Sequence, residues 1–493
     1  MLLIIEYFCT IHKYYKIISS PMKNIIYLAL ILLVFNSCGD NNSKTKPSVL
    51  IPTTIVGTIN QSPYPNIIFT DDNNRFEGKI TNGQFSINTN IAHPGLYVVA
   101  YGRDKSVVFI NPGDTLFINA EGQRFSRTLS FKGPLTEENT YMNEKALLDR
   151  QRYSTKVKDY KLGEAEFIAA MNYSREQNQS ELDKTAAKKK FNPAFISLMN
   201  NEIIYEWATD RVNYNLYHEF YNKIENLELS ENYYTFLQDL KYDDASLLGS
   251  IKFKEFISNY TGVFAKKEME SEKDTGLKDN AEAMAKFNFI KATFKNQAIV
   301  NFLLYTTLKQ HIRYEGANGT KELLSIFNSS TNNESHKAVI QNDYSKWENL
   351  EEGQAAPTFN YADMKGKLYG LENFRGKYVY IDVWATWCGP CRKELPHLEE
   401  LQEKYKGSDK IVFTSISIDQ NTDAWRKMVT EKEMQGIQLL ADAAWQSSIV
   451  KDYKISGIPR FLLIDPNGEI ISVNAPRPSS DRIKAKLAHL IEG

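Results

Sequence analysis

The feature that most constrains the fold of this chain is an apolar segment that leads directly into a pair of cysteines. Residues 377–385 are largely apolar and rich in aromatic side chains, which is typical of a strand covered on both faces. Cys388, Gly389, Pro390 and Cys391 follow after a short connection. Proline is tolerated in the first turn of a helix, where a missing amide hydrogen costs least. The stretch therefore predicts a buried strand followed at once by a helix that begins near Cys388.

The two cysteines are placed for thiol–disulfide chemistry. Unpaired amides and the helix macrodipole favour a thiolate at Cys388, which lowers a free-cysteine pKa of about 8.5 toward roughly 3.5–7.5. Cys388 is thus the candidate nucleophile that attacks a substrate disulfide, and Cys391 is the candidate thiol that resolves the mixed disulfide. Half of a zinc site and an inert structural disulfide are the alternatives. We expect no metal, because no second Cys or His pair stands at ligand spacing.

The motif Trp-Cys-Gly-Pro-Cys at 387–391, after such a strand, resembles the thioredoxin superfamily. Residues 385–396 are more narrowly similar to the TlpA/ResA-type extracytoplasmic thioredoxin-like proteins, and the resemblance covers about residues 352–493. It implies an α/β thioredoxin-like fold and a thiol–disulfide oxidoreductase. The redox-active dithiol is then the only redox group, with no further cofactor.

The same resemblance implies supporting roles around the dithiol. Asp382 matches the buried acid of the thioredoxin strand, whose raised pKa would let it relay a proton for Cys391. Glu394 lies on the same helix face as Cys391 and matches an acid that ResA-like proteins carry near the dithiol. Trp384 and Trp387 are expected to wall the site. A solvated strand aspartate and an exposed helix glutamate remain the alternatives.

A second loop is expected to meet the dithiol. Gly457, Ile458 and Pro459 resemble the cis-proline loop that faces the active-site disulfide in this family. A cis bond there frees the backbone of Ile458 to pair with an incoming extended peptide. Arg460 stands where thioredoxins commonly carry threonine, a departure that bears on the choice of partner and leaves the fold unaffected.

The N-terminus reads as a targeting segment. A short basic region after Met22 precedes an apolar run at 25–35, which is shorter than the roughly 20 residues of a membrane span. Ser37 and Cys38 follow, so the segment resembles a bacterial lipoprotein signal with Cys38 as the lipidated first mature residue. An ordinary signal peptide and a buried core cysteine are the alternatives. We expect residues 1–37 to be the signal, with the natural start at Met22, and a location at the cell envelope.

The remaining chain divides by its periodicity. At 493 residues, it is long enough for about three domains. After a lipidated tether at 38–48, short β-rich runs separated by turn signals predict an all-β sandwich-like domain at 49–134. This domain is similar to one of unassigned role in Bacteroidota lipoproteins. Helical periodicity predicts an all-α domain at 135–350, and strand–helix alternation predicts the thioredoxin-like domain at 351–493.

Two further expectations concern charge. A net charge of −1 gives no indication of nucleic-acid binding. The charged stretch at 266–280 reads as a solvated loop.

The leading hypothesis is an envelope-anchored reductase of protein disulfides. Gly-Pro between the cysteines matches reducing thioredoxins, whose potential is about −270 mV, against about −120 mV for the oxidant DsbA. Such a protein needs a membrane thiol donor, such as a DsbD/CcdA-like protein. The ResA-like resemblance implies apocytochrome c thiols, and hence cytochrome c maturation, as one substrate class.

Two other functions stay open. A thiol peroxidase of the peroxiredoxin type would place threonine three residues before its reactive cysteine, where this chain has Ala385. The predicted β and helical domains, at 49–350, also make up most of the chain. A partner-binding or docking lipoprotein with an accessory redox domain is therefore the alternative from another class.

Overall fold

The computed structural model describes residues 50–71, 74–271 and 280–492. The predicted signal segment with Met22, the lipidation site Cys38 and the tether lie outside the described residues. From Leu50 onward the chain forms one compact unit, in which successive segments have their own hydrophobic cores.

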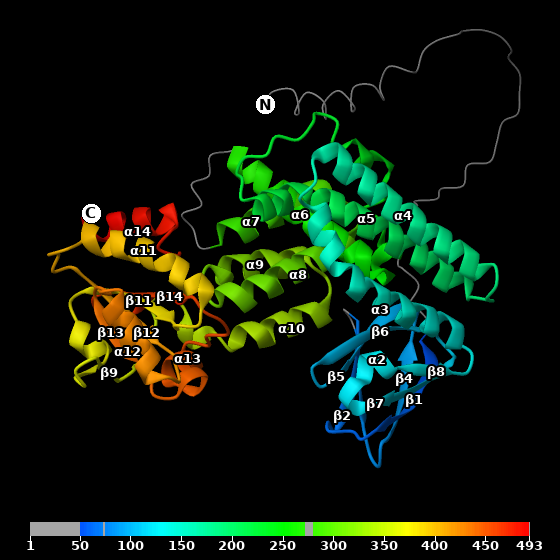
Figure 1. Ribbon diagram of the computed structural model, residues 1–493, viewed down its shortest axis with the longest axis horizontal. Coiled ribbons are helices and arrows are strands. Elements are labelled where there is room, and N and C mark those ends of the chain that lie inside the picture. Colours follow the sequence, from blue (N-terminus) through cyan, green and yellow to red (C-terminus); the bar gives the residue numbers. More distant parts are fainter. Residues whose placement is uncertain (1–49, 72–73, 272–279, 493) are drawn as a thin grey trace, which may run out of the picture. The chain divides into compact units, whose positions relative to one another are not determined.

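The first described segment is a sandwich of two sheets that share one core (Figure 1). One sheet has the order β4-β1-β7-β8, with β1 (Ile51–Asn60), β4 (Gln84–Ile91), β7 (Thr115–Glu121) and β8 (Ser130–Lys132). The other has the order β3-β2-β5-β6, with β2 (Asn66–Thr70), β3 (Arg75–Lys79), β5 (Gly95–Tyr101) and β6 (Asp104–Ile110). Burial alternates along β4, so Phe85 points inward and meets Phe69 of the opposite sheet, with ring centroids 6.4 Å apart. The predicted sandwich-like fold is confirmed.

The middle segment is helical, as predicted. It follows a short α2 (Phe125–Thr128) and comprises α3 (Thr136–Asp159), α4 (Glu164–Ala186), α5 (Pro193–Asn222), α6 (Ile251–Ser271), α7 (Ala281–Thr293), α8 (Gln297–Glu315), α9 (Thr320–Ser330) and α10 (Glu334–Ser345). The apolar stripe of α5 serves two cores: Phe195 and Ile203 pack on the sandwich, whereas Trp207 packs among the helices. The predicted domain limits stay predictions. Helices α3, α4 and α5 all contribute side chains to the sandwich core, so the helical segment packs directly on the β segment.

The expected loop at 266–280 is wrong in its first part. Helix α6 continues to Ser271, and residues 272–279 lie outside the described residues. Lys266, Lys267 and Glu268 are exposed on the last turns of this helix. A run of charges suits a solvent-facing helix surface as well as a loop, so charge alone did not distinguish the two.

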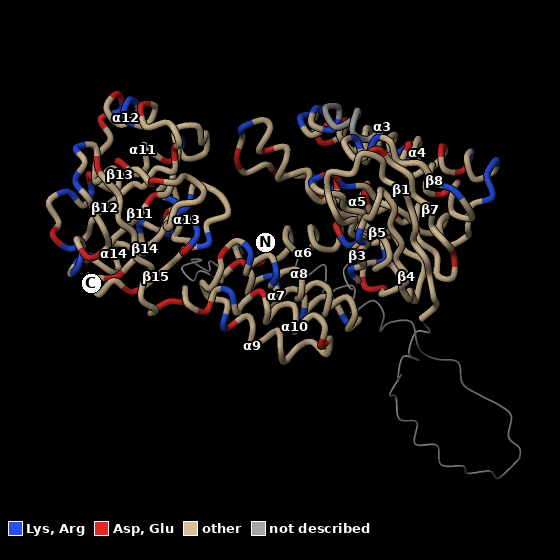
Figure 2. The backbone as a smooth tube through the Cα atoms, turned by 90° about the horizontal axis from the view of Figure 1, so that it is seen from below, with Lys and Arg blue, Asp and Glu red and all other residues tan. Residues whose placement is uncertain are grey.

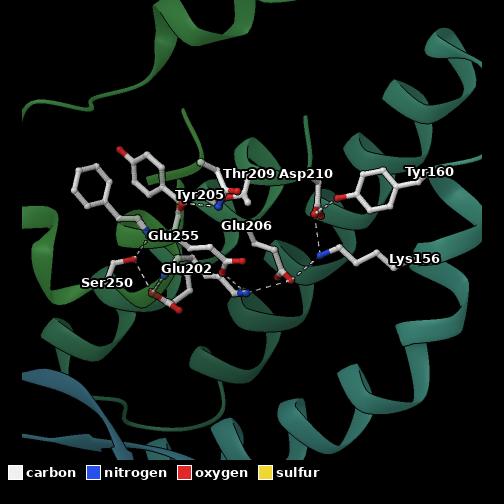
Figure 3. Close-up of polar contacts among 12 residues, drawn as sticks. Lys156, Tyr160, Glu202, Tyr205, Glu206, Thr209, Asp210, Ser250 and Glu255 are labelled. Carbon is white, nitrogen blue, oxygen red and sulfur yellow. Dashed lines mark hydrogen bonds and ion pairs between the residues drawn. The ribbon is translucent and has the colours of Figure 1, made fainter. Parts of the chain in front are cut away.

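A partly buried ionic cluster joins the helices α3, α5 and α6 (Figure 3). The ammonium of Lys156 lies 2.9 Å from the carboxylate of Asp210 and 3.4 Å from that of Glu206. The hydroxyl of Tyr160 donates to Asp210 at 2.8 Å, and Lys252 approaches Glu206 at 4.0 Å. Opposite charges compensate one another throughout the cluster, which is the arrangement of a structural contact between helices.

The last segment is a mixed sheet flanked by helices, the predicted thioredoxin-like α/β fold. Its order is β10-β9-β13-β12-β11-β14-β15, with β9 (Tyr361–Asp363), β10 (Leu368–Tyr369), β11 (Tyr378–Trp384), β12 (Ile411–Ser417), β13 (Ile437–Leu440), β14 (Arg460–Ile464) and β15 (Ile470–Ser472). Strands β11, β12 and β13 are parallel, and β14 runs antiparallel to β11. The helices are α11 (Gly389–Lys404), α12 (Thr422–Glu431), α13 (Ser448–Asp452) and α14 (Asp481–Glu492). The β9–β10 hairpin, which extends the sheet beyond β13, had no recognised signal in the sequence.

The central strand β11 sends side chains to both faces of this sheet. Tyr380 stacks on Phe461 in the core that α11 and α14 cover, and these two helices lie side by side in Figure 1. Ile381 and Val383 face the opposite core, which α12 and α13 close. Because side chains alternate along a strand, Asp382 shares the face of Tyr380, beneath α11.

The end of α8 contacts the thioredoxin-like segment beside β14 and β15. The side chain of Asn318 donates to Ser472 Oγ at 2.9 Å, and a guanidinium nitrogen of Arg460 donates to the carbonyl of Tyr314 at 3.1 Å. Asn474 donates to the carboxylate of Glu315 at 2.6 Å. The helical segment thus forms part of the surroundings of the loop that precedes β14.

Charges of both signs are interspersed along the described chain (Figure 2). Within the described residues, no helix combines the length and the apolar character that a membrane crossing requires.

Candidate functional site

The two cysteines form a disulfide at the start of α11. Their Cα atoms are 5.3 Å apart, and both side chains are buried. Cys388 is the N-cap of the helix, and its sulfur accepts a hydrogen bond from the amide of Cys391 at 3.1 Å. A sulfur therefore occupies the position where an oxygen normally caps a helix, so the unpaired amides of α11 favour negative charge on Cys388.

A buried carboxylate holds the turn between β11 and α11. Asp419 follows β12 and accepts hydrogen bonds from the amide and the hydroxyl of Thr386, at 2.8 and 2.7 Å. Ser417 donates a third hydrogen bond to Asp419 at 2.7 Å. Sequence reasoning missed Asp419. The signal was its place just after a parallel strand next to β11, because such strand ends meet at one edge of a sheet.

Asp382 is a carboxyl group with little access to water. Only 3 % of its surface is exposed, on the face of β11 that α11 covers. Burial, with a smaller contribution from the carboxylate of Glu394, raises the pKa of Asp382 from 3.8 to about 8. Asp382 therefore titrates in the range where a group can both accept and return a proton near neutral pH.

Glu394 is buried on the first turns of α11. Its carboxylate accepts hydrogen bonds from the amide and the hydroxyl of Ser479, each at 3.0 Å. Arg477 approaches the same carboxylate at 3.9 Å. The segment before α14 is thus tied to the helix that carries the dithiol, a contact that sequence reasoning did not predict.

The peptide bond between Ile458 and Pro459 is cis, as predicted from the motif. Arg460 pairs with Val383 across β14 and β11, so this loop ends beside the strand that leads to Cys388. Ile458 packs against the same core cluster as both cysteines. Among the described residues, none bonds to its backbone amide or carbonyl.

The two tryptophans near the motif differ in exposure. Trp384 is fully buried in the core that also contains the cysteines, whereas Trp387 is 57 % exposed. Trp387 lies beside Trp445, with ring centroids 6.3 Å apart. These rings form an exposed aromatic surface next to the dithiol, and Trp445 is a further residue that sequence reasoning missed.

The described residues hold no group of three or more His, Cys, Asp or Glu side chains placed to bind a metal ion. Two histidines of the helical segment bond to backbone carbonyls: His311 to that of Asn318 at 2.8 Å, and His218 to that of Tyr160 at 3.1 Å.

The arrangement supports a reversible dithiol–disulfide cycle. A sulfur at a helix N-terminus can act as the attacking thiolate, and a second sulfur at bonding distance can displace it. A buried acid beneath the helix can take up and return the proton of the resolving thiol.

Comparisons with known proteins agree with this chemistry. Residues 351–487 match the family described as Redoxin. The thiol-disulfide oxidoreductase ResA of Bacillus cereus is 34 % identical over 133 residues, which is 27 % of this chain and 75 % of that protein. The thioredoxin-like protein YneN of Bacillus subtilis is 31 % identical over 150 residues, 29 % of this chain and 84 % of that protein.

Solved structures also match part of the chain. The thioredoxin domain of a thiol-disulfide oxidoreductase from Bacteroides vulgatus is 29 % identical, covering 29 % of this chain and 99 % of that one, with a TM-score of 0.27. The Redoxin match at 351–487 includes Cys388 and Cys391. Through that C-terminal segment, the chain belongs to the ResA/TlpA-type thioredoxin-like thiol–disulfide oxidoreductases.

Proposed function

We propose that the chain is a reductase of protein disulfides that works at the cell envelope. The observation that carries this proposal is the Cys388–Cys391 disulfide at the N-terminus of α11, above a buried acid whose pKa is about 8. The cis-proline loop beside β11 supplies backbone groups for an extended substrate.

The first half of the cycle forms a mixed disulfide. The thiolate of Cys388 attacks one sulfur of the substrate disulfide, and the substrate S–S bond breaks as the new bond forms. The other substrate sulfur leaves as a thiolate and takes a proton. The substrate chain lies along Ile458 in this step, with its cysteine against the exposed ring of Trp387.

The second half releases the substrate. In its ionised form, Asp382 accepts the proton of Cys391, whose thiolate then attacks the sulfur of Cys388. The Cys388–Cys391 bond forms, the mixed disulfide breaks, and the second substrate thiol departs with a proton. Two electrons have passed from the protein dithiol to the substrate. The substrate disulfide is reduced, and Cys388 and Cys391 are joined in a disulfide.

The reducing direction has support in the sequence between the cysteines. Gly389 and Pro390 match the reducing members of the superfamily, near about −270 mV. A dithiol used in this way must be reduced again, for which we propose a membrane thiol donor of the DsbD/CcdA type. Cysteine pairs of apocytochromes c are one substrate class, as the ResA relationship suggests.

The envelope location rests on the N-terminal segment. Lipidation of Cys38 would hold the folded unit at a membrane and place it on the extracytoplasmic side. Labelling of cells with a radioactive or clickable fatty acid is expected to mark the wild-type protein and not the Cys38→Ala variant.

Mixed-disulfide trapping tests the proposed function. Because Cys391 is the resolving thiol, the Cys391→Ser variant should retain substrates covalently on Cys388, and mass spectrometry identifies them after non-reducing purification. The variant with both cysteines replaced by serine is the control for non-covalent binding. Equal recovery from the two variants would contradict the assignment of Cys388 as nucleophile. A measured potential above about −150 mV would contradict the reducing direction.

A further inference from the structure

A cavity of about 740 Å³ lies beside the cis-proline loop, and the redox chemistry does not account for it. It opens to solvent and is bordered by the end of α8, by the cis-proline loop with the start of β14, and by the segment that leads into α14. Its lining includes Arg313, Tyr314, Glu315, Ile458, Arg460, Asn474, Arg477 and Arg482. The helical segment therefore forms one wall of a cavity whose other walls come from the thioredoxin-like segment.

The cavity has an excess of positive charge. Four arginines line it, and two carboxylates meet them: Glu315, which accepts a hydrogen bond from Asn474, and Glu394, which Arg477 approaches at 3.9 Å. Arg313 and Arg477 are exposed. At the start of α14, Ser480 accepts a hydrogen bond from the amide of Arg482 at 3.2 Å, and the carboxylate of Asp481 offsets the positive end of the helix dipole.

The basic side chains of the lining indicate which chemical class of ligand the cavity would bind. Every basic residue of the lining is an arginine. The guanidinium group is planar and binds a carboxylate with two parallel hydrogen bonds, which a lysine cannot do. Tyr314, which is 51 % exposed, and Ile458 supply apolar walls for the methylene groups of an acidic side chain.

The cavity continues the surface on which the substrate is expected to lie. Ile458 and Pro459 line it and also form the loop beside the dithiol. Ser479, also in the lining, bonds to Glu394, which lies one helical turn from Cys391. An extended chain advances about 3.3 Å per residue, so a substrate that lies along Ile458 also passes over the lining of this cavity.

We propose that this arginine-lined cavity binds acidic side chains that flank the disulfide of the substrate polypeptide. The inference rests on the proposed function and deepens it, because it names the substrates that the chain selects. The protein then reduces disulfides with neighbouring aspartate or glutamate faster than the same disulfides in neutral or basic surroundings.

The test uses the reduced full chain and two synthetic peptides, each with one internal disulfide. The peptides differ only in whether glutamate or glutamine flanks the cysteines. The second-order rate constant for peptide reduction is expected to be about fivefold higher for the glutamate peptide at low salt, which corresponds to about 1 kcal/mol. This ratio should fall toward one at high salt, because 1 M salt shortens the screening length to about 3 Å.

Arg313 gives the sharpest variants, because it is exposed and lies on α8, outside the segment that carries the dithiol. Arg313→Gln should reduce the preference, and Arg313→Glu should favour a third peptide flanked by lysine. Arg103→Gln, at an exposed turn between β5 and β6, is the matched control and should leave the preference unchanged. Reduction of the neutral 2-hydroxyethyl disulfide should be the same for all of these proteins.

The outcomes separate the two proposals. Equal rates for the glutamate and glutamine peptides, with 2-hydroxyethyl disulfide still reduced, would overturn the cavity assignment and leave the reductase intact. Failure to reduce any of these disulfides would overturn both. If Arg313→Gln abolished binding to vesicles of anionic phosphatidylglycerol and left peptide selection unchanged, the cavity would belong to a membrane contact and the inference would be wrong.

Discussion

At the scale of single residues, three carboxyl groups surround the dithiol and differ in environment. Asp382 is buried with a raised pKa, whereas Asp419 and Glu394 each accept several hydrogen bonds. Asp419 and Glu394 hold the neighbouring chain segments in place through these hydrogen bonds. Asp382 makes no such contact with a backbone amide of the described residues, and we propose that it transfers protons.

Asp382→Asn is expected to stabilise the oxidised protein at alkaline pH. The folded protein holds the Asp382 proton up to about pH 8, whereas the unfolded chain releases it near 3.8. Stability contributed at low pH is thus lost as the pH rises from about 4 to about 8. The variant avoids this loss, which amounts to at most about 6 kcal/mol at about 1.4 kcal/mol per pH unit.

Urea unfolding at pH 5 and pH 8 measures this difference, with Asp409→Asn as the control at an exposed acid. The gain in the free energy of unfolding should be larger at pH 8 than at pH 5. A gain that did not depend on pH would contradict the raised pKa. The same Asp382 variant should slow release of the mixed disulfide by about 10²-fold or more, because general acid–base catalysis is lost.

Asp419 and Thr386 are expected to act as one unit. Asp419→Ala leaves the amide and hydroxyl of Thr386 without their acceptor and should cost about 2–3 kcal/mol of stability. Thr386→Val removes only the hydroxyl and should cost about 1 kcal/mol. A double-mutant cycle should give a coupling energy of about 0.5 kcal/mol or more, and a coupling of zero would show that the two contacts are independent.

At the scale of elements, the chemistry depends on the junction of β11 and α11. The strand ends at Trp384, and the helix begins at Gly389 with Cys388 as its cap. Cys391 lies within the first turn, so both sulfurs and the free amides meet at one point. A helix that started one turn later would separate the dithiol from these amides.

Alkylation of the reduced protein tests this junction. Iodoacetamide should react with Cys388 at pH 6 several times faster than with a simple thiol peptide, because the helix N-terminus favours the thiolate. Cys391, which is less exposed and lies inside the helix, should react more slowly. Peptide mapping distinguishes the two sites, and equal slow labelling of both would contradict thiolate activation by α11.

At the scale of the whole molecule, the helical segment contacts the thioredoxin-like segment through hydrogen bonds. Asn318 bonds to Ser472 and to the amide of Val473, and Tyr314 accepts from Arg460. The helices in turn rely on internal contacts, among them the ionic cluster around Lys156 (Figure 3). Disturbing the helices should therefore alter substrate selection more than the exchange chemistry.

Lys156→Met tests the structural role of that cluster. Its loss leaves Asp210 and Glu206 without their nearest cation, so the free energy of unfolding should fall by about 2 kcal/mol. This value is below that of a fully buried pair, because the Lys156 side chain is 37 % exposed. Lys158→Met on the same helix, at an exposed position, is the control. Reduction of 2-hydroxyethyl disulfide by folded Lys156→Met should equal that of the wild type.

The sequence by itself determined the redox chemistry and the order of the three segments. The strand pattern at 377–385 and the spacing of Cys388 and Cys391 act over a few residues, so their geometry follows from local rules. The turn signals, the helical stripes and the strand–helix alternation are local too. They were sufficient to predict a β segment, a helical segment and a thioredoxin-like segment.

Only the tertiary structure decided which distant groups meet at the site. Thr386 and Asp419 are 33 residues apart, Glu394 and Ser479 are 85 apart, and Tyr314 and Arg460 are 146 apart. At least one residue of each pair lies in a loop or near the end of an element. Such positions have no hydrophobic periodicity from which the partner could be predicted. The arginine-lined cavity is of this kind: its charges are scattered along the chain, and only the packing of α8 against the loop before β14 brings them together.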